Sequence, residues 1–183
     1  MKIAVCISGA SGAIYAKRLI ENLKEHELFI VISEIAKKIF KDEIGIEFDE
    51  FMINFKAKIY DNKDFSSPLA SGSFKIDACV VVPCSVKSLS AIASGYAENL
   101  ISRCADVCIK EKRKLILLVR EMPFSSIHLE NMLKLSNLGV TIMPPCPGFY
   151  YKPKTIEDLV DFVVGRILDQ LSIENNLFKR WGW

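Results

Sequence analysis

The chain has 183 residues, half of them hydrophobic, and this length is typical of one folding domain with a substantial core. Its 24 basic and 22 acidic residues leave a net charge of only +2, which excludes a protein that works by coating nucleic acid or an anionic membrane. No signal-peptide pattern precedes the first apolar segment, and no apolar stretch reaches about 18 uncharged residues. These features predict a single cytoplasmic domain over residues 1–183 that binds a small ligand.

Short β-type segments alternate with helical patterns along most of the chain, as in a parallel sheet with crossover helices. The expected elements are, in order, a strand over 2–8, a helix over 15–25, a strand over 28–33, a helix over 34–45, a less regular segment over 48–75 with an extended loop over 61–73, a strand over 76–85, a long helix over 86–110, a strand over 114–121, a helix over 125–139, a strand over 140–145 and a helix from Thr155. Gly139 suits a helix C-terminus, and Thr155 with Asp158 suits an N-terminus. The pattern predicts a three-layer α/β fold.

The residues that follow the first four strands have chemistry suited to a phosphorylated ligand. Ligand sites in open α/β sheets form outside the carboxyl ends of the strands. Residues 8–12 (SGASG) follow the first strand, Ser33 the second, residues 83–88 (PCSVKS) the third, and Arg120 and Glu121 the fourth. Glycines allow close backbone approach, hydroxyls donate hydrogen bonds, and helix N-termini offer free N–H groups to an anion.

The SGASG turn taken alone has several interpretations. It lacks the Gly-x-Gly-x-x-Gly spacing of a dinucleotide turn and the Gly-Lys-Ser/Thr of a nucleoside-triphosphate loop. A nucleophile elbow needs glycine where Ala13 stands, and His128 is the candidate base. The turn is otherwise a tight connection from strand to helix.

The six cysteines show no Cys-x-x-Cys spacing, and most lie within apolar segments. They are expected to be small buried hydrophobes rather than a disulfide framework. Cys104 and Cys108 are four residues apart on a predicted helix and are the candidates for a shared metal, with His26 and His128 as further ligands. A structural zinc site needs four converging ligands, so no metal is expected.

The last helix has an arginine in an apolar stripe. Helical spacing aligns Arg166 with Leu159, Phe162 and Val163, so its guanidinium either extends out to solvent or meets a buried anion. A second apolar side of the same helix predicts a subunit interface; it comprises Val160, Val164 and Leu168.

A stiff loop rich in Pro and Gly carries Tyr150 and Tyr151 before that helix, and it either holds an aromatic ring over a ligand or packs on the surface. The basic segment 110–114 (KEKRK) is typical of a solvated helix end, although one of its lysines is a candidate functional residue.

Four segments of the chain resemble one family when they are taken together. They are ISGASGAIYAKRLIENL, LASGSFKIDACVVVPCSVKSLSAIASGYAENLISRCADV, LVREMPFSSIHLENMLKLSNLGVTIMPPCPGFY and TIEDLVDFVVGRILDQL. In this order they are similar to the flavin prenyltransferases of the UbiX/Pad1 type, and they cover nearly the whole chain.

This resemblance implies a flavodoxin-like (Rossmann-like) domain that is usually assembled as a dodecamer. It also implies an enzyme that joins the dimethylallyl group of dimethylallyl monophosphate to N5 and C6 of reduced FMN. The product, prenylated FMN, is the cofactor of UbiD-type decarboxylases, which are the expected recipients. No metal is implied.

The resemblance also assigns residues. The family's FMN contacts fall on Gly9, Ala10, Ser11, Ser33, Ser85, Val86, Lys87, Ser88 and Arg120. Its dimethylallyl phosphate contacts fall on Tyr150 and Arg166, and Lys110, Arg103 and Glu121 also match functional positions.

These residue types suit the implied chemistry. Cationic groups at the phosphate lower the barrier to breaking the allylic C–O bond, and Arg166, Lys110 and Tyr150 would provide them. Glu121 is the candidate for proton transfer, with a salt bridge to an arginine as its structural alternative. Phe65 or Trp181 would add an aromatic wall that excludes water.

Two other functions share parts of this pattern. An FMN-dependent cysteine decarboxylase has an active-site His near the start and an Asn in a Pro-x-Met-Asn motif, whereas this chain has His26 late in its first helix and IMPPCPGFY without Asn. A non-enzymatic FMN carrier subunit would not need Lys110, Glu121, Tyr150 and Arg166.

Overall fold

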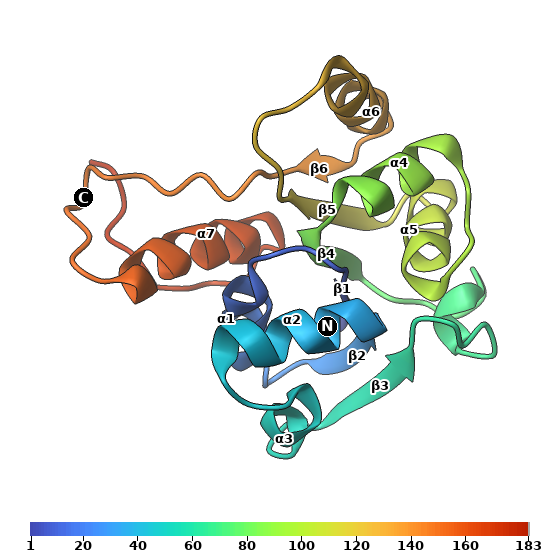
Figure 1. The fold of residues 1–183 in the computed structure, drawn as a ribbon, viewed down its shortest axis with the longest axis horizontal. Coiled ribbons are helices and arrows are strands. Elements are labelled where there is room, and N and C mark those ends of the chain that lie inside the picture. Colours follow the sequence, from blue (N-terminus) through green and yellow to red (C-terminus); the bar gives the residue numbers. More distant parts are fainter. Residues whose placement is uncertain (183) are drawn as a thin grey trace.

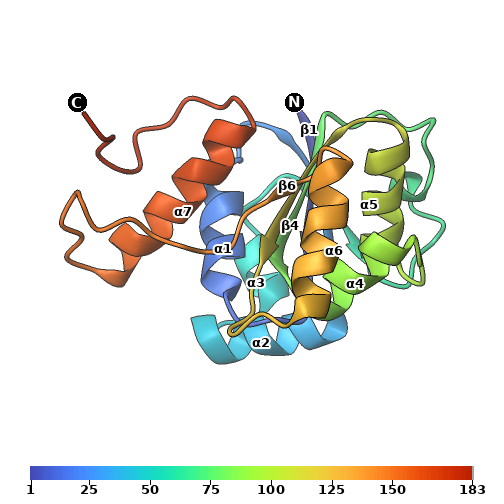
Figure 2. The same ribbon diagram turned by 90° about the horizontal axis from the view of Figure 1, so that it is seen from above.

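A computed structural model describes residues 1–182 of the chain, with a six-stranded sheet between two layers of helices (Figures 1 and 2). The elements are β1 (Lys2–Ile7), α1 (Ala13–Asn22), β2 (Glu27–Ile32), α2 (Glu34–Ile44), α3 (Phe48–Met52), β3 (Ala57–Asp61), a 3₁₀ helix η1 (Pro68–Ala70), β4 (Ala78–Cys84), α4 (Val86–Ser94), α5 (Leu100–Lys110), β5 (Lys114–Val119), α6 (Ser126–Asn137), β6 (Thr141–Ile142) and α7 (Ile156–Gln170). Every strand pairing is parallel.

The central strands are buried on both faces, which explains their nearly continuous apolar sequences. Along β1, Ile3, Val5 and Ile7 face a core shared with α1, α2, α3 and α7. Ala4 and Cys6 face a second core, shared with α4, α5 and α6. The predicted three-layer flavodoxin-like α/β fold with a central parallel sheet is confirmed.

The strand order β3-β2-β1-β4-β5-β6 fixes where a ligand can bind. From β1 the chain moves outward to β2 and β3, and it then returns to β4 beside β1 before moving to β5 and β6 on the other side. The crossover connections therefore diverge between β1 and β4. This point of reversal is where doubly wound sheets open a crevice at the carboxyl ends of their strands.

Residues 48–75 were expected to be less regular, with an extended loop over 61–73, and two elements before that loop were not predicted. They are α3, which buries Phe48, Phe51 and Met52, and the edge strand β3. The sequence of β3, AKIYD, is mostly exposed and carries charges, as edge strands commonly do. Because β3 buries little surface, it has no strong apolar pattern to reveal it.

The single long helix predicted over residues 86–110 is two helices. Gly95 adopts a φ of 72° and ends α4 in the left-handed region. A new N-terminus follows at Asn99, whose side chain accepts from the N–H of Ser102 while the Ser102 hydroxyl accepts from the N–H of Asn99. This capping box starts α5 and turns its axis away from α4.

The final helix α7 starts as predicted, with a capping box between Thr155 and Asp158. Its second apolar side is not an exposed interface, because Val160, Val164 and Leu168 are buried in the core shared with α1. Arg166 instead lies on the exposed side, where it pairs with Asp169 at 2.8 Å. Within the described residues, no helix is long and apolar enough to span a membrane.

Candidate functional site

A cavity of about 330 Å³ lies at the carboxyl ends of β1 and β4, at the point of reversal. Five segments of the chain form it: the turn after β1, the start of α2, the loop after β3, the connections around α4, and the residues after β5. Its lining residues are Ser8, Gly9, Ala10, Ser33, Ile35, Asn62, Ser85, Val86, Lys87, Ser88, Ala91, Glu98, Asn99, Ile101, Arg120 and Glu121.

Most of the residues predicted to contact a flavin nucleotide line this one cavity. They are Gly9, Ala10, Ser33, Ser85, Val86, Lys87, Ser88 and Arg120. Glu121 lines it as well. Ser11, which was predicted with them, is exposed and lies outside the lining. The carboxyl ends of the strands therefore bring together residues that are more than 100 positions apart in sequence, such as Gly9 and Arg120.

Three helix N-termini meet at the cavity. Ser33, Ser85 and Asn99 are the N-caps of α2, α4 and α5, and all three line the wall. Each accepts a hydrogen bond from a backbone N–H of its own first turn. Because the N-terminal end of a helix carries partial positive charge, three such ends create a site that favours an anion such as phosphate.

Ser8 joins the turn after β1 to the loop after β4. Its buried hydroxyl donates to the carbonyl of Pro83 at 2.9 Å and accepts from the N–H of Ser85 at 2.8 Å. The two walls of the cavity are thereby held at a fixed separation.

Gly9 is required by the close approach of that turn to α2. A Cβ atom at Gly9 would lie 2.1 Å from Cγ2 of Ile35, far closer than any nonbonded contact allows. The backbone at Gly9 therefore forms the cavity wall itself, which is what a nearby ligand needs in order to contact main-chain groups.

The N-terminus of α1 is occupied by a carboxylate rather than free. Glu43, from the last turn of α2, accepts from the N–H of Gly12 at 3.0 Å and from that of Ala13 at 2.8 Å. These N–H groups, which the sequence suggested for a ligand phosphate, already have a partner. The other three N-termini therefore carry the case for anion binding.

Arg120 provides a second argument that the cavity suits an anionic ligand. Its backbone N–H donates to the Cys84 carbonyl, whereas its side-chain Nε is buried and has no hydrogen-bond partner within the part of the chain that the structure describes. A buried guanidinium nitrogen is costly when it is unpaired. A phosphate or a flavin carbonyl oxygen in the cavity would satisfy it, so the donor set fits FMN.

Charged side chains also line the cavity, among them Lys87, Glu98 and Glu121. Lys87 forms an ion pair with Glu98 at 3.1 Å, and the Lys87 side chain is 82% exposed. Glu121 accepts from the N–H of Met122 at 3.0 Å rather than from an arginine. The salt-bridge alternative for Glu121 is therefore not what the structure shows.

The remaining predicted residues lie away from this cavity in the single chain. Arg103 donates to the Ala70 carbonyl and pairs with Asp106, and Lys110 pairs with Glu111 at the far end of α5. Tyr150 and Arg166 belong to the loop before α7 and to α7 itself.

Tyr150 lies in an aromatic cluster beside a second, shallower groove. Its ring meets that of Trp181 edge to face at 5.0 Å between centroids, and Tyr151 and Phe162 lie behind it. The groove, of about 400 Å³, is lined by Tyr150, Tyr151, Lys152, Lys179, Arg180, Trp181 and Gly182. Of the two aromatic residues proposed as a pocket wall, Trp181 is thus beside Tyr150, whereas Phe65 is exposed on the loop after β3.

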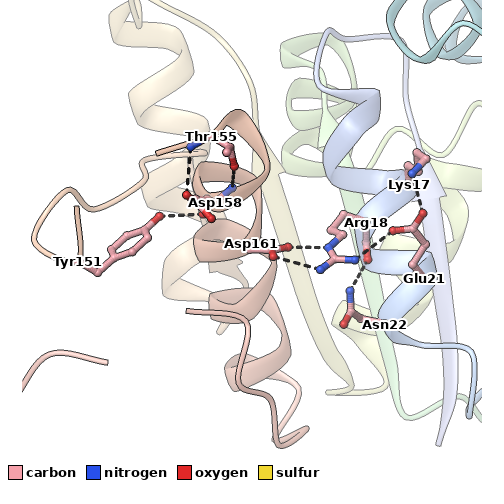
Figure 3. A network of polar contacts seen from close by, with 8 residues as sticks. All are labelled: Lys17, Arg18, Glu21, Asn22, Tyr151, Thr155, Asp158 and Asp161. Carbon is pink, nitrogen blue, oxygen red and sulfur yellow. Dashed lines mark hydrogen bonds and ion pairs between the residues drawn. The ribbon is translucent and has the colours of Figure 1, made fainter. Parts of the chain in front are cut away.

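A polar network holds α7 and its preceding loop in place (Figure 3). Arg18 of α1 donates two hydrogen bonds to Asp161 of α7, at 2.6 and 3.1 Å. The Tyr151 hydroxyl donates to the Asp158 carbonyl at 2.8 Å, and burial raises the pKa of this hydroxyl. The loop carrying Tyr150 is thereby fixed relative to α1.

Three polar lining residues escaped the sequence analysis. Asn62 follows the unrecognised strand β3 and accepts from the N–H of Ile101 at 3.0 Å. Glu98 and Asn99 lie in the unrecognised break between α4 and α5. Gly95 and the Asn99–Ser102 spacing were the available signals of that break.

A parallel α/β sheet with a phosphate-favouring cavity at its point of reversal is typical of nucleotide-binding proteins. The family model described as Flavoprotein matches residues 1–168. The UbiX flavin prenyltransferase of Methanocaldococcus jannaschii is 62% identical over 183 residues, which cover 100% of this chain and 99% of that protein. The chain therefore belongs to the UbiX flavin prenyltransferase family.

Solved structures agree with this assignment. A dodecameric FMN-dependent UbiX-like decarboxylase from Escherichia coli O157:H7 is 41% identical, with a TM-score of 0.96 and 100% coverage of both chains. AnUbiX (PadA1), solved in complex with FMN and dimethylallyl pyrophosphate, is also 41% identical, with a TM-score of 0.95 and coverage of 100% of this chain and 98% of that one.

Proposed function

We propose that this protein is a flavin prenyltransferase that joins the dimethylallyl group of dimethylallyl monophosphate to N5 and C6 of reduced FMN. The observation that carries the proposal is a cavity where three helix N-termini and the unpaired Arg120 Nε converge, in a chain 62% identical over its full length to a flavin prenyltransferase. AnUbiX, which has the same fold, was solved with FMN and an allylic pyrophosphate.

FMN would bind in the cavity between the turn after β1 and the start of α4. Gly9 and Ala10 would contact it through the backbone, and Ser33 and the segment 85–88 would donate hydrogen bonds. Arg120 would pair its buried Nε with an oxygen of the nucleotide. When bound, reduced FMN supplies the nucleophilic N5 and C6 atoms.

The phosphate of the prenyl donor needs cations, because breaking the allylic C–O bond leaves negative charge on the departing group. We assign this role to Arg166, Lys110 and Tyr150, with Arg103 as a further contact. Arg166 and Lys110 each have a side chain that is 47% exposed, so a bound phosphate can reach them. Glu121 would move the proton at the acceptor atom, since this residue lines the FMN cavity.

The two groups of residues lie apart within one chain, so we propose that association of several copies completes the site. Large apolar side chains are exposed on the elements concerned, among them Phe149 at 68%, Ile156 at 68% and Trp181 at 75%. Apolar exposure of this kind marks association surfaces. The similar protein from E. coli is dodecameric, and we expect a homo-oligomer here, a dodecamer.

The product would leave for a UbiD-type decarboxylase, the class of enzyme that uses prenylated FMN. We expect both to act in the cytoplasm. The six cysteines are all free thiols, which suits a reducing compartment.

The direct test is to mix the protein anaerobically with reduced FMN and dimethylallyl monophosphate and to measure the mass of the released flavin. A gain of one C5H8 unit is expected. Unmodified FMN, with the diphosphate donor also tried, would contradict the proposal and favour an FMN carrier or a cysteine decarboxylase.

Arg166→Ala is expected to bind FMN normally but to lose prenyl transfer, because it removes a cation from the donor phosphate and leaves the FMN cavity intact. Asp169→Asn is the matched control, since it breaks the same ion pair while keeping the arginine. Full activity of Arg166→Ala would overturn the phosphate role.

A further inference from the structure

The core between the sheet and α5 contains a cluster of thiols. Cys6 of β1, Cys79 of β4 and Cys104 of α5 are each 0% exposed. Their sulfur atoms lie within 4.8 Å of one another. The Cys79 sulfur is 3.8 Å from that of Cys6 and 3.7 Å from that of Cys104. Three elements thus direct one sulfur each toward a common point.

A fourth thiol borders this point. Cys108 lies one turn after Cys104 on α5 and is also fully buried, although its sulfur is not among the three that lie within 4.8 Å of one another. The sequence indicated only the helical pair, Cys104 and Cys108. Register on the adjacent strands β1 and β4 is what brings Cys6 and Cys79 to the same face of the sheet.

The sulfur separations agree with the size of a tetrahedral metal site. Zinc binds cysteine sulfur at about 2.3 Å, and two ligands of a tetrahedron at that radius are about 3.8 Å apart. The Cys79 sulfur keeps this spacing to two neighbours. Four cysteine ligands without a water-accessible position are the arrangement of a closed structural zinc site.

A basic residue borders the thiol cluster. The backbone N–H of Arg113 donates to the Cys108 carbonyl at 2.8 Å, and its guanidinium donates to the carbonyls of Phe74 and Gly72 at 2.8 and 2.6 Å. The positive charge of Arg113 would offset part of the negative charge of a thiolate complex.

We propose that the three converging thiols of Cys6, Cys79 and Cys104, with Cys108 from the next turn of α5 as the fourth ligand, form a buried structural site for a thiophilic divalent cation of the Zn²⁺ type. Each sulfur that binds releases its proton to solvent, so four thiols and one Zn²⁺ give a tetrathiolate complex and four protons. No electron is transferred. The site crosslinks β1, β4 and α5, and it stabilises the sheet beneath the cavity without taking part in prenyl transfer.

The test measures bound metal in the full-length protein. The chain is expressed in zinc-supplemented medium and purified anaerobically without chelator, and zinc is counted per chain. It is also refolded with Co²⁺, a spectroscopic substitute for Zn²⁺. One metal per chain is expected, with the visible bands and thiolate-to-cobalt charge-transfer bands of tetrahedral sulfur coordination.

Variants then locate the site. Cys79→Ala removes the central sulfur and is expected to lower metal affinity at least tenfold, and Cys108→Ala, at the edge of the cluster, serves if the first variant fails to fold. Cys84→Ala is the matched control, because Cys84 is equally buried but lies outside the cluster, and it should retain one metal. Wild-type protein without zinc and without cobalt bands would overturn the proposal, as would equal metal loss in Cys84→Ala.

Discussion

The hydroxyl of Ser8 is the most informative single group to remove, because its two hydrogen bonds join the turn after β1 to the loop after β4. In Ser8→Ala the N–H of Ser85 loses the oxygen that it meets at 2.8 Å. The Pro83 carbonyl loses its 2.9 Å hydroxyl donor and keeps only the longer bond from the Ser8 N–H, at 3.3 Å. Two hydrogen bonds are lost at a site that is nearly closed to water.

The cost follows from these contacts. A net hydrogen bond contributes about 1 kcal/mol, and leaving a buried N–H unpaired adds to the loss, so we expect about 2.5 kcal/mol of destabilisation. An unfolding entropy of about 2 cal/mol/K per residue corresponds to about 0.4 kcal/mol per degree for a chain of this length. The melting temperature should therefore fall by about 6 °C.

The assay is thermal unfolding followed by circular dichroism at one protein concentration, together with FMN titration. FMN affinity should fall by about tenfold, since the segment 85–88 is no longer held against the turn after β1. Ser8→Thr keeps the hydroxyl and should restore most of the affinity. Ser94→Ala removes an exposed hydroxyl that donates to the Ala91 carbonyl, and its unfolding free energy should stay within about 0.5 kcal/mol of wild type.

The reasoning would be refuted by a Ser8→Ala protein that melts within a degree of wild type and binds FMN equally well. That result would mean that the walls of the cavity are held by packing alone. A melting temperature that falls without any change in FMN affinity would confirm that the Ser8 hydroxyl stabilises the fold. It would also show that this hydroxyl does not position the cavity walls for FMN.

Two further predictions concern α7. Arg18 of α1 donates two hydrogen bonds to Asp161 of α7, and the two side chains are 37% and 17% exposed. A double-mutant cycle with alanine should therefore give a coupling free energy of about 0.5–1 kcal/mol after solvent screening. Additive losses of unfolding free energy in urea would contradict this prediction. Hydrogen bonding from Arg180 lowers the pKa of Asp169 in the folded protein. The ionised carboxylate therefore stabilises the fold at pH values above the unfolded-state pKa of about 3.9, and this stabilisation is lost as the pH falls through the folded-state pKa. The unfolding free-energy gap between wild type and Asp169→Asn should therefore shrink as pH is lowered from about 7 toward 3, and a constant gap across that range would argue against it.

The regular core of the fold was predictable from local patterns. The segments KIAVCI, ELFIVI and KLILLV are short, apolar and β-branched, and each is followed by a helical period, so a parallel sheet was the expected arrangement. The start of α7 was equally readable, since the capping box of Thr155 and Asp158 is a contact between near neighbours in sequence. Elements that bury little, such as β3, have no such pattern and were missed.

The candidate site was likewise predictable in part from the sequence. The residues that follow the strands predicted the position of the cavity, because the carboxyl ends of parallel strands meet at one edge of the sheet for any loop conformation. This pattern could not reveal Asn62, which depended on recognising β3, nor the unpaired Nε of Arg120, which is a property of the folded surroundings. Helical periodicity also placed Arg166 in an apolar stripe, whereas it is exposed.

The sequence by itself determined the fold class, most of the helix and strand positions and the residues at the strand ends, because these depend on the periodicity of side chains and on contacts within a few residues. Only the tertiary structure decided that Tyr150 and Arg166 lie apart from the cavity and that Cys6 and Cys79 join the cysteines of α5. Such placements depend on strand register and on which face of a helix packs inward. These are properties of the whole packed core, in which residues more than 70 positions apart come into contact.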